Sequence, residues 1–236
     1  MIQRATSADP AILGLLRKHP KVERVEVGGS SGIEFEIGHW SRAVVIDDLS
    51  VEIKGLVEMM DNNPMVCADV VSIPSGAATL ALIAFGPLID AGILVEPPTF
   101  LASDSRGTEL IADWLKTVGW SAGVTLHDEP QELGSILAAT GMAAIRTPAD
   151  LEDIDELYAE RFGRSFFVRR NEEMVWATSL VEGQPYACYR MRITPDEPYS
   201  LLSLSLLGDR NGKAGAGSAV HAMNVMAGFE ESLGVA

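Results

Sequence analysis

The chain has 236 residues, of which 47% are apolar and 22% charged, so it can bury the core of one large domain or two smaller ones. Its net charge of −15 argues against nucleic acid or an anionic membrane as a partner, because each phosphate contact needs a cation. No apolar run reaches the roughly 20 residues that span a bilayer. The N-terminal residues also lack the apolar segment of a secretory signal. We therefore expect a cytoplasmic protein.

Alternating helix and strand patterns fill the first half of the chain. PAILGLLRKHP (10–20) has apolar residues at helical spacing, with Asp9 as the predicted cap and Pro10 in the first turn. SVEIKGLVEMM (50–60) is predicted to be a short amphipathic helix that is capped by Ser50. A buried strand over 68–73 is predicted to lead through a tight turn into an apolar helix over 77–91. The other predicted strands are VERVEV (22–27), IEFEI (33–37) and AVVID (43–47).

Strand patterns dominate after Gly134, which indicates a small α/β part joined to an α+β part. Before this point, TFLAS (99–103) is predicted to be a strand and TELIADWLKTVG (108–119) a helix. Beyond it, helices are predicted over 148–163 and from about Lys213 to Phe229. The predicted strands are SILAATGMAAI (135–145), FFVRR (166–170), MVWATSL (174–180), YACYRMRI (186–193) and YSLLSLSLLG (199–208).

The turn Pro74–Ala77 opens the predicted 77–91 helix and is a candidate anion site. The first N–H groups of a helix have no intrahelical partners and carry the positive end of its dipole. Ser75 adds a hydroxyl group, and Gly76 and Ala77 leave the backbone accessible to a carboxylate or phosphate. A plain strand-to-helix connection, in which Gly76 only permits the turn, explains the same pattern.

Three further groups of residues are candidates for a catalytic or binding site, and each group also has a simpler explanation. His127 and Asp128, with Glu129, form a possible general base or merely a polar loop. Arg169 and Arg170 can bind a carboxylate or face solvent at a strand end. Lys213 precedes a glycine-rich tract that allows close approach of a ligand or of another chain segment.

The two cysteines are predicted to be reduced core thiols. Cys67 and Cys188 lie in apolar runs, far apart and without the spacing of metal ligands. The remaining histidines lie in separate predicted elements. We therefore expect no metal site.

Several tracts, in order, resemble N-acetyl-γ-glutamyl-phosphate reductase, a relative of aspartate-semialdehyde dehydrogenase. ATSADPAILGLLRKHPKVERVEV (5–27) resembles the first Rossmann turn and helix of that family, and IPSGAATLALIAFGPLIDAGIL (73–94) resembles its active-site turn and helix. Residues 134–170 and 206–235 resemble its dimerisation sheet, crossover helix and final helix. The resemblance implies a shortened Rossmann-like part (1–72), a mixed-sheet dimerisation and catalytic domain (73–212) and a C-terminal helix that returns to the cleft (213–236).

The sequence departs from this family at each catalytic feature. Gly76 stands where the family has its nucleophilic cysteine, and Thr6–Asp9 stands where it has a glycine-rich dinucleotide turn. No histidine lies between Arg106 and His127, where the family's histidine belongs. The chain is also shorter than the family, mostly between Val27 and Pro74. We therefore expect no NADP cofactor and no cysteine-dependent reduction.

Three functions remain open from the sequence. The first is a repurposed protein of amino-acid metabolism that binds or transforms a small anionic metabolite, and the second is a catalytically silent structural or regulatory partner. The third is an active NADP-dependent reductase. The run of apolar strands after Gly134 predicts a homo-oligomer, a dimer or tetramer, and the second function leaves open a pairing with an active reductase. Residues predicted to line the cleft of the first are Ser75, Arg106, His127, Asp128, Arg169 and Lys213.

Overall fold

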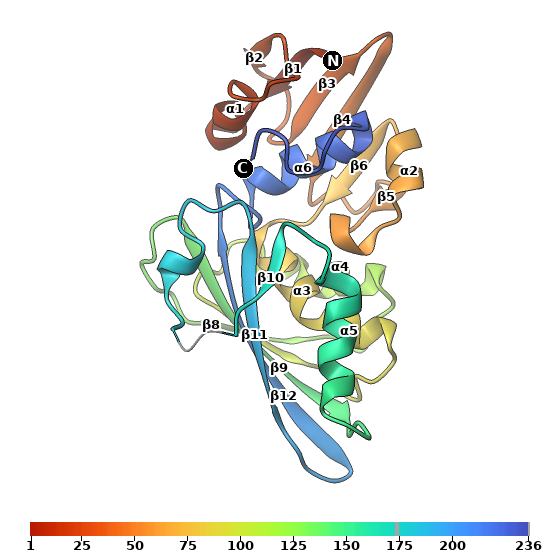
Figure 1. Ribbon diagram of the computed structural model, residues 1–236, viewed down its shortest axis with the longest axis vertical. Helices are drawn as coiled ribbons and strands as arrows, with labels where there is room; N and C mark the ends of the chain where they lie inside the picture. Colours follow the sequence, from red (N-terminus) through yellow and green to blue (C-terminus); the bar gives the residue numbers. More distant parts are fainter. Residues whose placement is uncertain (173–174, 236) are drawn as a thin grey trace.

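The computed structural model describes residues 1–172 and 175–235, in which two six-stranded mixed sheets are each packed against helices (Figure 1). The predicted α/β plus α+β class is confirmed. The elements of the first half are β1 (Ile2–Ser7), α1 (Pro10–Leu16), β2 (Val25–Val27), β3 (Ile33–Ile37), β4 (Trp40–Ile46), β5 (Ile53–Lys54), the 3₁₀ helix η1 (Val57–Met59), α2 (Asn62–Cys67), β6 (Val70–Ile73) and α3 (Gly76–Asp90).

The second half supplies a second sheet. Its elements are β7 (Thr99–Ala102), η2 (Thr108–Leu110), α4 (Ile111–Thr117), β8 (Thr125–Asp128), β9 (Ile136–Arg146), α5 (Glu152–Phe162), β10 (Val168–Arg170), η3 (Thr178–Leu180), β11 (Ala187–Thr194), β12 (Tyr199–Asp209) and α6 (Ala216–Ala227). The strand order is β2-β1-β3-β4-β6-β5 in the first sheet and β10-β11-β12-β9-β7-β8 in the second.

The chain returns to the first sheet at its end. In Figure 1, α6 (blue) lies against the N-terminal strands (red to orange), and both termini lie at this end of the molecule. Ala219, Val220 and Met223 of α6 belong to the same buried core as Ile2 and Val44. The first sheet is therefore completed by a helix that is distant in sequence.

A buried arginine joins α6 to this part of the protein. Arg42 of β4 is only 3% exposed, and its guanidinium donates to the carbonyl oxygens of Met65 and Ala68 at the end of α2. It also donates to the carbonyl oxygen of Met226 near the end of α6 and stacks on Trp40. Helix carbonyls without intrahelical partners carry partial negative charge, so one cation stabilises both helix ends.

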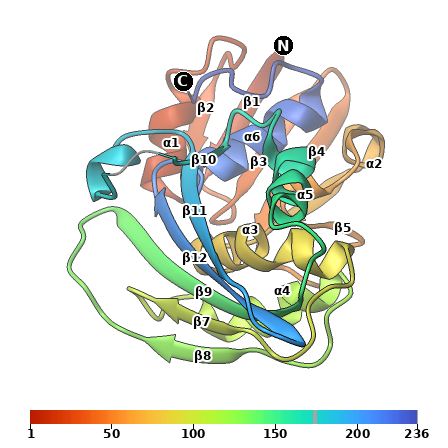
Figure 2. The same cartoon turned by 60° about the horizontal axis from the view of Figure 1, so that its bottom comes forward.

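Helices α3, α4 and α5 cover one face of the second sheet. Helix α3 is buried on nearly all sides and packs on β9 and β12, with α4 and α5 beside it (Figure 2). Phe85 of α3 lies so close to Gly141 of β9 that a Cβ atom at position 141 would be 3.0 Å from its ring. A small residue in the strand therefore lets the helix approach the sheet.

Several sequence predictions are confirmed and others are wrong. Asp9 caps α1 by accepting hydrogen bonds from the amides of Ala11 and Ile12, as predicted. The predicted helix over 50–60 is wrong: Gly55 adopts a φ of +154°, and the segment instead forms β5 and η1. In MVWATSL, Met174 lies outside the described residues, and the rest contains η3 rather than a strand.

The two cysteines lie in different environments. Cys188 is buried and free, as predicted, but Cys67 is exposed at the end of α2, a helix that we did not predict. Among the described residues, no helix is long and apolar enough to cross a membrane.

Candidate functional site

The turn after β6 has the predicted strand-to-helix form. Ser75 is the extended N-cap residue of α3, and its amide donates to the Asp47 carboxylate over 2.9 Å. Trp114 of α4 donates to the same Asp47 oxygen over 2.8 Å. The positive end of α3 therefore already has a carboxylate beside it, supplied by the chain itself.

The position that resembles the nucleophile site is filled by backbone. A Cβ atom on Gly76 would lie 2.5 Å from the carbonyl oxygen of Ala214 and 3.3 Å from Leu137. Gly76 and Ala77 are buried. A cysteine at position 76 would not fit unless the segment before α6 moved away.

The segment over residues 209–217 reaches this position through a tight, glycine-dependent turn. The buried carboxylate of Asp209 accepts hydrogen bonds from the amides of Gly183 and Asn211. A Cβ atom at Gly212 or Gly215 would lie 2.1 Å from a backbone carbonyl oxygen. The glycines thus permit close approach of another chain segment, one of the two alternatives left open by the sequence.

Lys213 lies in a buried charge cluster. Its side chain is fully buried, and Nζ lies 2.8 Å from Oε1 of Glu58, whose side chain is 4% exposed. His221 of α6 stacks on Phe167 with ring centroids 3.9 Å apart. Nε2 of His221 lies 2.9 Å from Oε2 of Glu231. Lys213, which the sequence suggested as a cation for an anionic ligand, is therefore already paired with Glu58.

Burial and neighbouring charges set the pKa values in this cluster. Burial lowers the pKa of His221 despite its hydrogen bond to Glu231. Burial is the largest effect on Glu58 and opposes its ionisation, but Lys213 and the other polar neighbours of Glu58 together outweigh it, so the pKa of Glu58 is lowered. The hydrogen bond from His221 likewise lowers the pKa of Glu231. At neutral pH His221 is thus neutral, with its Nε2 proton donated to Glu231, and both carboxylates are ionised.

Arg106 lies in the loop next to Ser75. A Cβ atom on Gly107 would be 2.6 Å from Ser75 Oγ, which places the loop over the start of α3. Arg106 and Arg210 both contact the Asp104 carboxylate, and hydrogen bonds from Arg106 lower the pKa of Asp104 to about 2. The Oγ atom of Ser75 and the Nε atom of Arg210 are buried without a hydrogen-bond partner among the described residues.

The remaining predicted site residues lie elsewhere. His127 and Asp128 are exposed on β8, whereas Arg169 is on β10 and stacks on Tyr186. These strands are opposite edges of one six-stranded sheet, and strands are spaced by about 4.8 Å, so the two edges are about 24 Å apart. His127 and Arg169 therefore cannot share one small-molecule site.

The turn before α1 does not fit a dinucleotide. In a dinucleotide-binding turn the pyrophosphate binds the free amides at the helix start. Here the Asp9 carboxylate accepts from the amides of Ala11 and Ile12 at 2.7 and 3.1 Å. A pyrophosphate would have to displace this carboxylate and bear its repulsion.

Two residues of this region were missed by the sequence predictions. Asp47 and Glu58 are the internal carboxylates that face the start of α3 and Lys213. The only signal for Glu58 was a single acidic residue in the apolar run GLVEMM. In the described part of the chain, no group of three or more His, Cys, Asp and Glu side chains is placed to hold a metal ion.

Comparison with known proteins shows the fold and no more. No protein-family model matches the chain, and no curated protein matches it in sequence. Two solved structures of aspartate semialdehyde dehydrogenase II from Vibrio cholerae, one of them complexed with ASA, match with TM-scores of 0.67 and 0.66. Each match covers 96% of this chain and 98% of the other at 11% identity. The chain thus has the fold of a semialdehyde dehydrogenase.

Replacing Gly76 with Ala should destabilise the protein. The added methyl group would lie 2.5 Å from the Ala214 carbonyl oxygen, and overpacking of this kind costs about 1–3 kcal/mol. Gly14→Ala in α1 is the matched control, because nothing lies within 4 Å of its Cβ position and Ala is the better helix former by about 1 kcal/mol. Urea unfolding measures both. A neutral Gly76→Ala would mean that this position is open.

Stability should fall as the pH drops below about 6.5, the ordinary pKa of histidine. Because the pKa of His221 is lowered in the folded protein, the unfolded chain takes up a proton first in this range. Lys213, Glu58 and Glu231 are the charged groups that face it. We expect His221→Gln to reduce the slope of unfolding free energy against pH below 6.5, and exposed His39→Gln to leave it unchanged. Equal slopes in both variants would contradict this assignment.

Proposed function

We propose that this protein is a catalytically silent relative of N-acetyl-γ-glutamyl-phosphate reductase that acts as a structural or regulatory homo-oligomer, in the cytoplasm. The observation that carries this proposal is the packing of the Ala214 carbonyl against Gly76. Cysteine-dependent reduction needs a thiolate at the start of α3. Here the position has neither a side chain nor space for one.

The cofactor region supports the same proposal. Hydride transfer needs a bound nicotinamide dinucleotide, and the Asp9 carboxylate occupies the helix amides that would bind its pyrophosphate. Lys213 forms a buried ion pair with Glu58 and is therefore not free to bind a ligand. An active NADP-dependent reductase, the third function left open by the sequence, is therefore the one these residues favour least.

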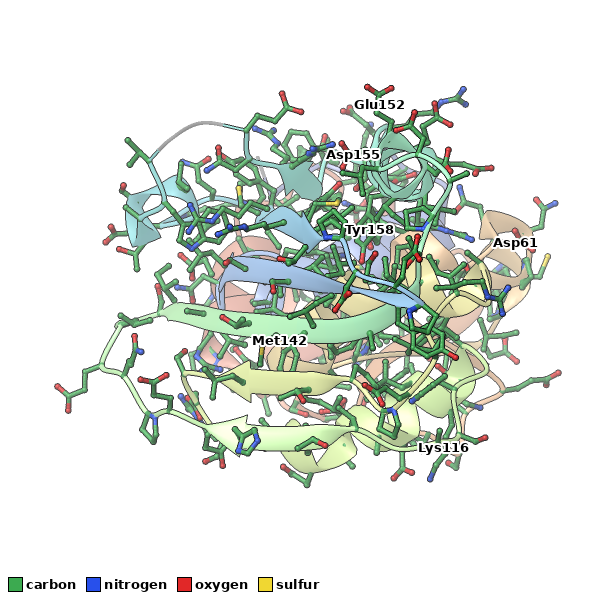
Figure 3. All side chains as sticks on the ribbon, turned by 90° about the horizontal axis from the view of Figure 1, so that it is seen from below. Asp61, Lys116, Met142, Glu152, Asp155 and Tyr158 are labelled. Carbon is green, nitrogen blue, oxygen red and sulfur yellow. The ribbon has the colours of Figure 1, made fainter. Side chains whose placement is uncertain are left out.

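The surface of the second sheet supports assembly. Its face opposite to α3, here called the open face, contains Leu101, Thr140, Met142, Leu201, Ser203 and Ser205. Met142 is 38% exposed and Leu201 44% exposed. Figure 3 labels Met142 on β9. One end of this face is covered by the segment that contains η3, where Trp176, Leu180 and Val181 join an apolar cluster with residues of β9, β11 and β12. Apolar side chains that gather on the remaining, uncovered part of a sheet face are typical of a protein–protein interface.

The open face by itself has a limited area. Strands β11, β12, β9 and β7 have 8, 11, 11 and 4 residues. At about 3.3 Å per residue and about 4.8 Å per strand they present roughly 540 Å², which is less than the roughly 800 Å² that each partner buries in a typical stable interface. Residues next to these strands would have to contribute the rest of a stable dimer interface.

A small-anion site at the start of α3 is the second candidate function. The buried Ser75 Oγ and Arg210 Nε atoms each lack a hydrogen-bond partner among the described residues. The loop that contains Arg106 lies against Ser75, and Arg106 and Arg210 share the Asp104 carboxylate. A small carboxylate or phosphate of amino-acid metabolism would accept hydrogen bonds from such donors. The Asp47 carboxylate, which contacts the Ser75 amide, opposes such a ligand.

Thermal unfolding in the presence of NADPH, acetyl phosphate or acetate separates these functions. A ligand that binds only the folded state stabilises it by RT ln(1 + [L]/Kd). We expect no stabilisation by any of the three compounds at millimolar concentration. Stabilisation by acetyl phosphate or acetate alone would favour the anion site, and stabilisation by NADPH would contradict the proposal.

Replacing Met142 with Asp should convert a dimer to monomers. The change places a charge at the centre of the open face, where it would be buried on association. Light scattering at micromolar concentration measures the mass. Val70→Asp is the matched control, because Val70 is similarly exposed, at 37%, on the other sheet. A wild-type protein that is already monomeric would refute the proposed assembly.

A further inference from the structure

Two adjoining cavities lie between α5 and the C-terminal end of α3, which stand next to each other in Figure 1. One has a volume of about 490 Å³ and the other of about 290 Å³, and Ala91 and Leu157 line both. Together they are called the α5 groove here. Because α3 has 15 residues and rises about 1.5 Å per residue, the groove lies about 20 Å from the start of that helix. It is therefore separate from the turn at Ser75 and Gly76.

One face of α5 forms a wall of the α5 groove. Asp153, Ile154, Leu157, Glu160 and Arg161 all line it. They recur at intervals of three or four residues, so they share one face of the helix. From Asp153 to Glu160 the helix axis rises about 10 Å, at about 1.5 Å per residue. The groove is thus long enough for a short, extended chain molecule.

The smaller cavity, at the start of α5, is mainly apolar and has a cation at its edge. Ile93 lines it, together with the buried Ile154. Arg146, the last residue of β9, lines it as well, and its guanidinium forms no ion pair with the described residues. Asp153 lies at this end too, where its carboxylate accepts a hydrogen bond from the Asp150 amide. This end therefore suits an aliphatic chain that carries a carboxylate.

The larger cavity is acidic. Asp90 and Glu160 line it, at the C-terminal end of α3, where the helix dipole is negative. Arg161 pairs with Asp90 over 2.5 Å, and Glu160 forms no ion pair in the described part of the chain. Glu58 lines this cavity as well. Its Oε1 contacts Lys213, but its buried Oε2 has no hydrogen-bond partner among the described residues. Because a buried acceptor without a donor is costly, this end favours an ammonium group.

We infer that the α5 groove binds a small aliphatic ω-amino carboxylate. Its ammonium lies at Glu160 and Asp90, its carboxylate lies at Arg146, and its methylene chain lies over Ala91 and Leu157. 6-Aminohexanoate is a suitable probe, because its six backbone bonds extend about 7 Å. A hydrogen bond of about 2.9 Å at each end would reach the charged side chains. The inference does not depend on the proposed homo-oligomer.

The chain and the charges of such a ligand have different effects. Burial of the methylene groups against Ile93, Ile154 and Leu157 provides most of the affinity. The side chains that would pair with the two charged groups are exposed. Exposed ion pairs contribute little to affinity, but they select a ligand with the matching charges and fix its direction in the groove.

Calorimetric titration with 6-aminohexanoate, hexylamine and hexanoate tests the class of ligand. We expect 6-aminohexanoate to bind at millimolar concentration, and hexylamine and hexanoate, which each lack one charged group, to bind about threefold more weakly or worse. Absence of binding by 6-aminohexanoate would overturn the inference. Equal affinity for hexylamine or hexanoate would overturn it as well, because one of the two charged ends would then have no effect.

Variants of exposed residues test the location of the site. Glu160→Gln and Arg146→Gln should each weaken binding of 6-aminohexanoate about threefold. Ala91→Leu, which fills the space shared by the two cavities, should abolish it. Glu156→Gln and Arg164→Gln are the matched controls, because both residues are exposed and line neither cavity. They should bind like the wild-type protein.

The variants also separate the two parts of the inference. Unchanged binding by folded Ala91→Leu would place the ligand outside the α5 groove. Loss of binding in Ala91→Leu together with unchanged binding in both charge variants would leave the groove as the site but contradict the ω-amino carboxylate. Circular dichroism checks that each variant is folded.

Discussion

The ion pair between Lys213 and Glu58 fixes the junction between the two sheets. Both side chains are almost completely removed from solvent, and leaving either charge unpaired there would cost about 3–5 kcal/mol. Glu58 comes from η1 of the first half, and Lys213 from the turn between β12 and α6. The pair therefore holds the 209–217 segment in place and with it the Ala214 carbonyl that lies against Gly76.

The closed site follows from that constraint. Once the segment is held, position 76 accepts only glycine, and the start of α3 is left with the Asp47 carboxylate and the Arg106 loop as neighbours. A side chain large enough to act as a nucleophile would have to break the ion pair or move the turn. The glycine at position 76 and the burial of Lys213 are thus linked through one segment of the chain.

The sequence predicted the local features and missed the long-range ones. The Asp9 cap and the long strands β9 and β12 depend on neighbouring residues, and a single sequence contains that information. The 50–60 segment looked helical by spacing, but Gly55 and the pairing of Ile53 with Val71 override it. Glu58 and Lys213 are far apart in the sequence, and only the complete fold brings them into contact. The candidate site was accordingly predicted at this turn without the neighbours that the fold supplies there, the Asp47 carboxylate and the Ala214 carbonyl.

A strongly acidic chain can self-associate only where local attraction outweighs the repulsion between the net charges of its copies. At a net charge of −15, two copies repel each other at long range. The proposed homo-oligomer would therefore need local attraction where its copies meet. On the open face, Arg169, Arg190 and Arg192 lie at one edge and Glu129 lies at the other. A uniformly basic face would repel its own copy, whereas a face that carries both signs of charge can meet a complementary potential.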